Sequence, residues 1–221
     1  MTLPRRTALA IVVACVLIPL CQLFVDRPLA TWSHDVLGRP HWSIVLQTIP
    51  EPILPGASIL IGVSGLAAGF GWRPGYWGRT MIAACVAALL AIVLKDQLKY
   101  VFGHTWPDTW VNNNPSWIQN GVYGFFPFHG GAGWASFPSG HTTTVTAPGA
   151  VLWVRAPRLR VLWSALIALT VIGLIGANYH FLGDCLAGMF LGVAVAAGVM
   201  ALIPEYGALN AKVASSATDH A

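Results

Sequence analysis

The sequence predicts an all-α membrane protein, a polytopic bundle of six helices. Of its 221 residues, 56% are hydrophobic and 9% are charged, whereas an ordinary soluble domain carries about 25% charged residues. The hydrophobic residues form runs that approach the ~20 residues needed to cross a bilayer. Lysine and arginine are distributed unevenly between the connecting segments, and this bias predicts how the bundle is oriented.

Six hydrophobic runs are expected to form the membrane-spanning helices. In chain order they cover about 7–25, 53–70, 81–100, 140–154, 161–179 and 184–203. The fourth run is short and begins with Thr142, Thr143 and Thr144. Such a polar helix end is stable at membrane depth where other helices shield it from lipid. We therefore expect the fourth helix to lie inside the bundle.

The first run has two interpretations. Arg5 and Arg6 precede it, as basic residues precede the apolar core of a secretory signal. The run is longer than such a core, however, and no small-residue cleavage site follows it. We expect an uncleaved first helix, followed by a short interfacial helix within the outer segment 26–52.

The positive charges predict that both termini are cytoplasmic. With the N-terminus inside, the inner segments hold eight basic residues, namely Arg5, Arg6, Arg73, Arg79, Arg155, Arg158, Arg160 and Lys212. The outer segments hold four, namely Arg27, Arg39, Lys95 and Lys99. This bias is the positive-inside pattern, and it places a single domain at 1–204 before a cytoplasmic tail at 205–221. The net charge of +4 follows from this topology, so no nucleic-acid partner is expected.

The same topology brings four ionisable residues from distant segments to the outer rim of the bundle. Lys99 ends the third predicted helix, His141 begins the fourth, and His180 and Asp184 lie between the fifth and the sixth. Each residue alone is equally well explained as an interfacial side chain that reaches toward water. Four such groups gathered at membrane depth are costly and indicate a functional site.

The residue types at this rim suit phosphoryl transfer. His180 and Asp184 are four apart, so on a helix they share a face, and a carboxylate on Nδ1 would leave Nε2 free to attack. Asp184 is also placed to cap the sixth helix, and both roles can hold at once. Ser139 and Gly140 begin the fourth helix, where free amides and the helix dipole favour an anion. Pro138 offers a structural explanation of the same residues, since it fixes a turn.

On these residues the chain resembles the type-2 phosphatidic acid phosphatase superfamily, which includes membrane lipid phosphatases and soluble vanadium haloperoxidases. The signature of that family has three parts, K-x6-R-P, P-S-G-H and S-R-x5-H-x3-D. Residues 138–141 reproduce the second part completely. His180 and Asp184 match the third part, and Lys99 and Pro107 match the first. The resemblance covers about residues 95–188.

Both arginines of the signature are replaced in this chain. Trp106 stands at the first position, and the Ser-Arg pair falls on residues 173–174, which are Gly-Leu. In the family these arginines bind the phosphate, and each charge-assisted hydrogen bond is worth about 1.5–3 kcal/mol. We expect other donors to replace them, namely His104, Asn178 or the asparagines at 112–114. A differently charged substrate, or the loss of phosphatase activity, would also explain the replacement.

The resemblance implies an enzyme that hydrolyses a lipid phosphomonoester or pyrophosphate on the outer face, without a metal or a cofactor. In that mechanism His180 is the nucleophile that becomes a phosphohistidine, Asp184 orients it, and His141 protonates the leaving group. Lys99, Ser139 and Gly140 would bind the phosphate. The implied partners are the bilayer and a lipid phosphate, and the implied location is a bacterial inner membrane with the site facing the periplasm.

Two other functions fit the same residues. The phosphohistidine could transfer its phosphoryl group to a lipid or a glycan in place of water. The chain could also bind lipid phosphate without catalysis, which the missing arginines favour. A soluble peroxidase and a channel fit less well, because the chain is hydrophobic and its polar residues gather at one rim.

A long outer loop, about 101–137, separates the third and fourth predicted helices. Its length indicates either a functional segment or one with structure of its own. It could form an aromatic belt at the membrane surface or a lid over the site. Its aromatic residues are Trp106, Trp110, Trp117, Tyr123, Phe125, Phe126, Phe128 and Trp134.

Overall fold

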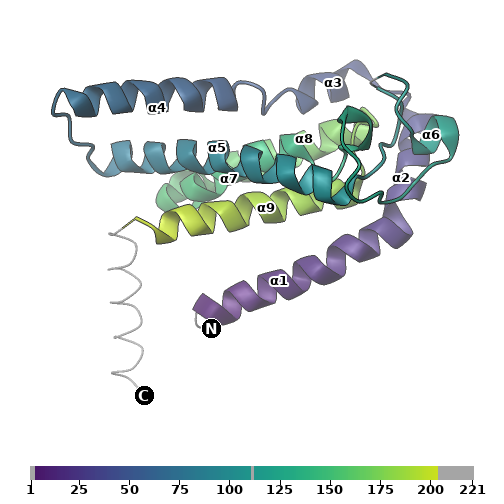
Figure 1. The fold of residues 1–221 in the computed structure, drawn as a ribbon, viewed down its shortest axis with the longest axis horizontal. Helices are drawn as coiled ribbons and strands as arrows, with labels where there is room; N and C mark the ends of the chain where they lie inside the picture. The colour runs from purple at the N-terminus through teal and green to yellow at the C-terminus, as the bar shows by residue number, and fades with distance from the viewer. Residues whose placement is uncertain (1–2, 111, 204–221) are drawn as a thin grey trace.

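The computed structural model describes residues 3–110 and 112–203, and over these residues it is built from helices that run side by side (Figure 1). The predicted tail at 205–221 lies outside the described residues. The helices are α1 (Leu3–Leu20), η1 (Cys21–Val25), α2 (Asp26–Trp32), η2 (Ser33–Leu37), α3 (His41–Gln47), α4 (Ile53–Gly69), α5 (Tyr76–Phe102), α6 (Trp117–Asn120), η3 (Ala132–Trp134), α7 (Gly140–Arg155), η4 (Pro157–Leu159), α8 (Arg160–Gly176) and α9 (Leu182–Ala201).

All six predicted runs are helical, and the all-α prediction is confirmed. Within the described residues, four helical stretches are long and apolar enough to cross a membrane, namely Leu9–Leu37, Tyr76–Phe102, Pro157–Gly176 and Leu182–Ala201. Helix α4 is apolar but shorter, and α7 begins with polar residues. A count of six spans, and the orientation of the termini, stay predictions.

Helix α7 lies at the centre of the bundle, where it packs against α5, α8 and α9. Thr142, Thr143 and Thr144 are buried, as are most of the residues that follow them in the helix. The Thr143 hydroxyl donates 2.7 Å to the Ser139 carbonyl, so part of the polar character is satisfied within the helix itself. Neighbouring helices therefore shield this polar end, as the sequence predicts.

Helices α1 and α4 form the periphery. Figure 1 shows α4 alongside α5 and α1 on the opposite side of the bundle, beside α9. Both expose large apolar side chains, such as Ile11 on α1 (58% exposed) and Leu66 on α4 (67%). In a bilayer these faces would contact lipid.

The sequence predicts that the first helix ends near residue 25. In the structure the helical stretch instead continues to Leu37 through two π-helical segments. Buried polar residues in its second half explain the continuation. The Asp26 carboxylate accepts a 2.8 Å hydrogen bond from the Gly183 amide, and the Ser33 hydroxyl donates 2.6 Å to the Ile175 carbonyl. These bonds hold the stretch against the end of α8 and the start of α9.

Glycines allow α9 to approach α7 closely. A Cβ on Gly188 would lie 2.5 Å from the Ser139 carbonyl oxygen, and one on Gly192 would lie 2.8 Å from Thr146 Cβ. On α8, a Cβ on Gly173 would lie 2.6 Å from the Gln47 nitrogen of α3. Small residues at helix contacts bring backbones together in membrane bundles, so these positions fix how α7 and α8 are placed.

We predict that Gly192→Ala destabilises the protein and that Gly198→Ala does not. The added methyl group at residue 192 would meet Thr146 Cβ at 2.8 Å and the Ala147 nitrogen at 2.9 Å, and overpacking of this kind costs about 1–3 kcal/mol. Gly198 lies on the same helix with nothing within 4 Å of such a methyl group, so alanine there should gain about 0.5–1 kcal/mol of helix stability. Thermal unfolding in detergent measures both, and equal melting temperatures for the two variants would contradict the packing described.

Candidate active site

A cavity of about 260 Å³ lies where α4, α5 and α7 meet the outer loop and the α8–α9 connection. Its lining combines two imidazoles, two lysines, one carboxylate and an aromatic wall. The lining residues are Pro50, Glu51, Leu54, Ile92, Lys95, Lys99, Trp106, Gly140, His141, Thr144, Tyr179 and His180. Four of the residues singled out in the sequence, Lys99, Gly140, His141 and His180, thus share one cavity.

The two histidines approach the cavity from different elements. His141 is in the first turn of α7, and His180 is in the connection that precedes α9. Their ring centroids are 6.0 Å apart at an interplanar angle of 67°, and the ring of Tyr179 lies 5.3 Å from each. An atom held between the two imidazoles could therefore interact with both.

Asp184 lies behind His180 and is fully buried. Its Oδ2 atom is 3.5 Å from His180 Nδ1, and it accepts hydrogen bonds from the Ser136 hydroxyl (2.5 Å) and the Phe181 amide (3.2 Å). The hydrogen bond from the Phe181 amide caps the start of α9. The geometry thus allows both roles expected for this carboxylate, and the orienting of His180 stays a prediction.

His104 reaches the same carboxylate from the other side. Its Nδ1 atom is 3.1 Å from Asp184 Oδ1, and its ring stacks on Phe125 with centroids 4.3 Å apart. The side chain is 0% exposed and does not line the cavity. The structure thus places His104 against the orienting carboxylate, away from the position where the sequence reading expects a phosphate donor.

The start of α7 borders the cavity through Gly140 and His141. Ser139 is the N-cap, and its buried hydroxyl accepts a 3.4 Å bond from the Thr142 amide. Ser139 does not line the cavity, whereas Gly140 and His141 do. The first amides of a helix have no acceptor within the helix, so this end is suited to an anion.

Two lysines on α5 line the cavity, although the sequence reading singles out Lys99 alone. The Lys99 ammonium donates to the Ala135 carbonyl and lies 5.5 Å from the centroid of the Trp106 ring. Lys95 lies one turn earlier, and its ammonium is 2.5 Å from an Asp96 carboxylate oxygen. The four-residue spacing between Lys95 and Lys99, which puts both on one helix face, is the sequence signal that could have identified Lys95.

Trp106 and Leu174 stand at the positions of the two signature arginines. Trp106 forms a wall of the cavity, with its ring centroid 5.1 Å from that of His180 and its Nε1 donating 2.8 Å to the Ala132 carbonyl. Leu174 is fully buried within α8, next to the glycine against which α3 packs. Among the residues that line the cavity, none is an arginine.

Asn178 and the asparagine run also lie outside the cavity lining. Asn178 is 4% exposed and has a φ of 55°, and its carbonyl accepts a bond from Trp110 Nε1. Asn114 accepts 2.6 Å from the Trp110 amide, within the outer loop. These residues shape the loop and the turn after α8.

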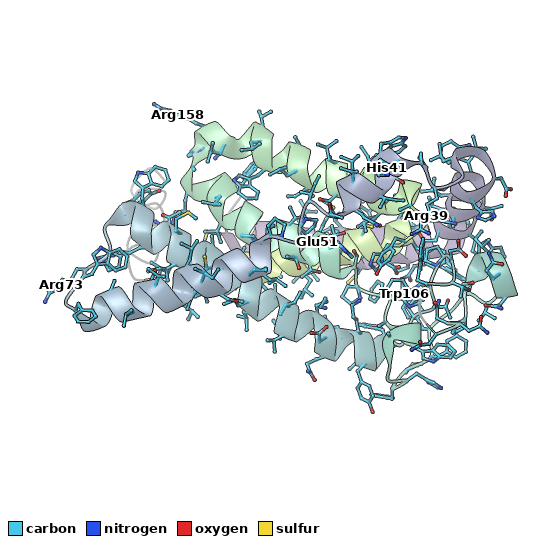
Figure 2. All side chains as sticks on the ribbon, turned by 90° about the horizontal axis from the view of Figure 1, so that it is seen from above. Arg39, His41, Glu51, Arg73, Trp106 and Arg158 are labelled. Carbon is cyan, nitrogen blue, oxygen red and sulfur yellow. The ribbon has the colours of Figure 1, made fainter. Side chains whose placement is uncertain are left out.

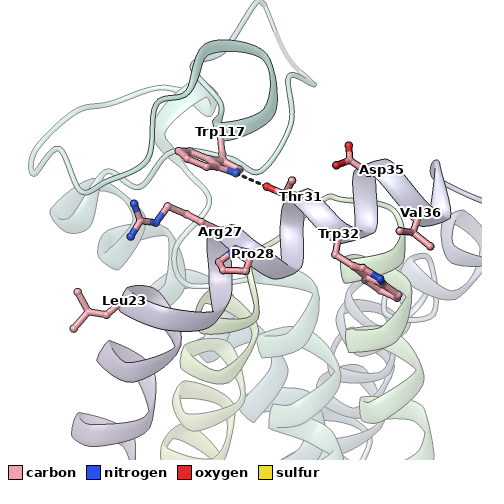
Figure 3. A pocket seen from close by; sticks show the side chains of 8 residues that line it. All are labelled: Leu23, Arg27, Pro28, Thr31, Trp32, Asp35, Val36 and Trp117. Atoms are coloured by element: carbon pink, nitrogen blue, oxygen red, sulfur yellow. Dashed lines mark hydrogen bonds between the residues drawn. The ribbon is translucent and has the colours of Figure 1, made fainter.

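The outer loop has structure of its own, with α6, η3 and isolated backbone pairing at His104 and Trp106. It contributes Trp106 to the cavity. Trp117 packs instead on α2, where its Nε1 donates 2.9 Å to the Thr31 hydroxyl (Figure 3). A larger cavity of about 510 Å³ opens there, and no histidine or lysine lines it, so we assign the chemistry to the smaller one.

Glu51 is a further cavity residue that the sequence reading missed. It lies in the turn before α4, is exposed, and supplies the one carboxylate of the lining. Figure 2 shows Arg39, Trp106 and His41 at one end of the molecule, with Arg73 and Arg158 at the opposite end. The cavity therefore lies toward the end that the charge distribution predicts to be outside.

The environment of His180 favours its neutral form. Burial lowers the pKa of His180 below its usual value, and the nearby Lys99 and His104 lower it further. The contact with Asp184 opposes this shift because it stabilises the charged imidazolium. A neutral imidazole is the form that can act as a nucleophile.

The sequence matches the profile of the PAP2 superfamily over residues 80–207. Two curated relatives, both lipid A 1-phosphatases, come from Rhizobium etli and Rhizobium johnstonii and are 33% and 32% identical over 100 residues. The match covers 45% of this chain and 40% and 38% of those relatives, so the chain spans less than half of their length. A solved structure, a transmembrane PAP2 type phosphatidylglycerolphosphate phosphatase from Bacillus subtilis, aligns over 85% of this chain and 92% of its own with a TM-score of 0.47 and 19% identity.

We predict that Ser136→Ala lowers stability by about 1–3 kcal/mol, because it leaves part of a buried carboxylate without its donor. Ser136 donates 2.5 Å to Asp184 Oδ2, and both residues are fully buried. Ser58→Ala is the matched control, since the Ser58 hydroxyl donates to the Leu54 carbonyl on the exposed face of α4. Thermal unfolding in detergent should separate the two variants, and a Ser136→Ala protein as stable as the control would contradict the role of this bond.

Proposed function

The chain belongs to the PAP2 superfamily, and on this premise we propose that it is a membrane lipid-phosphate phosphatase. The observation that carries the proposal is the convergence of His141, His180 and Lys99 on one cavity, with the Asp184 carboxylate buried behind His180. A nucleophile, an orienting carboxylate, an acid and a cation are the groups that phosphoryl transfer requires.

In the proposed mechanism His180 Nε2 attacks the phosphorus atom while Asp184 holds the Nδ1 proton. The P–N bond forms as the P–O bond to the lipid breaks, and His141 gives its proton to the departing oxygen. Water then attacks the phosphohistidine, His141 takes a proton from that water, and the P–N bond breaks to release inorganic phosphate. The 3.5 Å contact between His180 and Asp184 would tighten when substrate binds.

Charge on the transferring phosphoryl group would be stabilised by the Lys99 ammonium and by the amides of Gly140 and His141 at the start of α7. Preorganised donors of this kind act on the charge that develops in the transition state. Ser139 would contribute by fixing the first turn of α7, since its hydroxyl is committed to the Thr142 amide. These groups suffice for the proposed reaction without a metal ion.

The proposed substrate is a lipid that ends in a phosphomonoester or a pyrophosphate, presented from the bilayer. The lipid A 1-phosphatases among the relatives support this class of substrate. The exposed apolar faces of α1 and α4 support a location within a membrane. We place the protein in a bacterial inner membrane with the cavity toward the periplasm, because the basic residues predicted to be cytoplasmic outnumber those at the other end.

The expected result of a phosphate-release assay on a panel of lipid phosphates in detergent is hydrolysis that requires both histidines. His180→Ala removes the nucleophile and His141→Ala the acid, and we expect each to lower kcat/KM by about 10²–10⁴-fold or more. His34→Ala, on the exposed surface of η2, is the control and should retain activity. Hydrolysis that survives both substitutions would refute the mechanism, and a phosphorylated acceptor in place of free phosphate would identify a phosphotransferase.

The pH profile provides a second prediction. Because the folded environment lowers the pKa of His180, the nucleophile stays neutral at mildly acidic pH, and kcat/KM should fall only below about pH 6.5. Asp184→Asn removes a charge that raises this pKa, so its acidic limb should move to lower pH while kcat falls. The second ionisation of a phosphomonoester, near pH 6, affects both proteins equally. An acidic limb that moves to higher pH in Asp184→Asn would contradict the assignment.

A further inference from the structure

We propose that Lys95 is a second phosphate-binding cation, which acts with Lys99 in a cavity lined by no arginine and selects phosphomonoester over phosphodiester substrates. Lys95 lies outside the family signature that the sequence matches. The inference rests on the proposed function, because it concerns the same cavity. Four features of the structure carry it.

The first feature is the direction of the side chain. Lys95 and Lys99 are four residues apart on α5, so they share a helix face, and both line the cavity beside His141 and His180. The Lys95 side chain is 13% exposed. A lysine that served only to anchor the helix end at the membrane surface would extend its ammonium into water.

The second feature is the contact between Lys95 and the start of α7. A Cβ built on Gly140 would lie 3.1 Å from Lys95 Cδ and 3.5 Å from its Nζ. Gly140 is the first residue of α7, and the absence of a side chain there leaves room for the lysine to lie over the helix end. The Lys95 ammonium therefore lies close to the start of α7, and both border the same cavity.

The third feature is electrostatic. The N-terminus of a helix carries partial positive charge and favours anions, so an ammonium beside it is unfavourable unless an anion lies between them. Lys99 adds another positive charge to the same cavity. An anion in this position would interact favourably with both lysines and with the helix end, and phosphate is the anion that the proposed reaction supplies.

The fourth feature is the ion pair that Lys95 forms with Asp96. Its ammonium is 2.5 Å from Asp96, whose side chain is 56% exposed. Ion pairs that involve an exposed partner contribute little to stability, so a phosphate could displace this carboxylate at little cost. The Lys95 ammonium would therefore be available to a bound phosphate.

The two lysines favour a phosphate group that carries more than one negative charge. A phosphomonoester carries about −1.5 to −2 near neutral pH, whereas a phosphodiester carries one negative charge. Lysine acts as a compact point charge without the fixed fork of arginine, so two lysines with the α7 amides would bind a terminal phosphate from several sides. Loss of Lys95 should therefore weaken monoester binding more than diester binding.

The test compares Lys95→Gln with Lys95→Arg, Asp96→Asn and the parent protein in detergent. Inorganic phosphate is the probe, and its dissociation constant is measured by calorimetry. The KM and kcat of a lipid phosphomonoester are measured alongside, with the inhibition constant of a lipid phosphodiester, and an equal change for both lipids in Lys95→Gln would refute the selectivity. We expect Lys95→Gln to raise both the dissociation constant and KM by about 10- to 100-fold, with a smaller change in kcat. Lys95→Arg should restore most of the affinity, and Asp96→Asn should leave it unchanged or tighten it.

The outcomes separate this inference from the proposed function. If the parent hydrolyses lipid phosphate while Lys95→Gln keeps the parental dissociation constant and KM, the role of Lys95 is refuted and the proposed function stands. If the parent hydrolyses no lipid but binds phosphate in a manner that depends on Lys95, the function fails and the binding residue stands. A parent that binds no phosphate refutes the inference. Should Lys95→Gln unfold, Lys95→Met and Lys95→Arg provide the same comparison.

Discussion

The buried carboxylate of Asp184 is the group on which the rest of this structure depends. It accepts hydrogen bonds from Ser136 and Phe181, lies within 3.5 Å of His180 and approaches His104 at 3.1 Å. The backbone carbonyl of Asp184 accepts a 3.0 Å hydrogen bond from the Ser139 amide. One residue thus joins the outer loop, the α8–α9 connection and the start of α7. A buried charge that loses a partner costs about 3–5 kcal/mol, so the stability of this end and the geometry of the site depend on the same contacts.

Close helix packing places the second histidine relative to the first. His141 is in the first turn of α7, and its position depends on how near α9 can come. Gly188 and Gly192 allow that approach, because a side chain at either position would collide with the α7 backbone or its threonines. The buried threonines of α7 are tolerated in turn because α5, α8 and α9 surround them. Polar character at the helix start and tight packing along its length are therefore two parts of one arrangement, which directs an imidazole and free amides into the cavity.

The cavity combines positive charge with an aromatic wall. Trp106 packs against His180 and lies under Lys99, and Leu174 is buried in α8, so both positions aligned with signature arginines contribute apolar packing. The adjacent Gly173 allows α3 to pack close to α8, because a side chain there would collide with the Gln47 backbone nitrogen. Phosphate binding in this chain would then rely on lysines and helix amides. A lysine ammonium on its flexible side chain constrains the orientation of a phosphate less than a planar guanidinium does. The surrounding protein would therefore have to orient the phosphate.

The sequence by itself determined the main helices and singled out residues that the structure brings to one cavity, namely Lys99, Gly140, His141 and His180. Hydrophobic runs of sufficient length mark α1, α4, α5, α8 and α9, and the spacing of His180 and Asp184 marks their contact, because both signals are local along the chain. Three features were decided by tertiary structure alone. Lys95 lines the cavity beside Gly140, Glu51 enters from the turn before α4, and His104 lies behind Asp184 in place of lining the cavity. The i, i+4 spacing of Lys95 and Lys99 predicts a shared helix face, but not that this face borders the cavity. Each feature depends on the rotation and separation of packed helices, which are fixed by contacts between residues far apart in sequence.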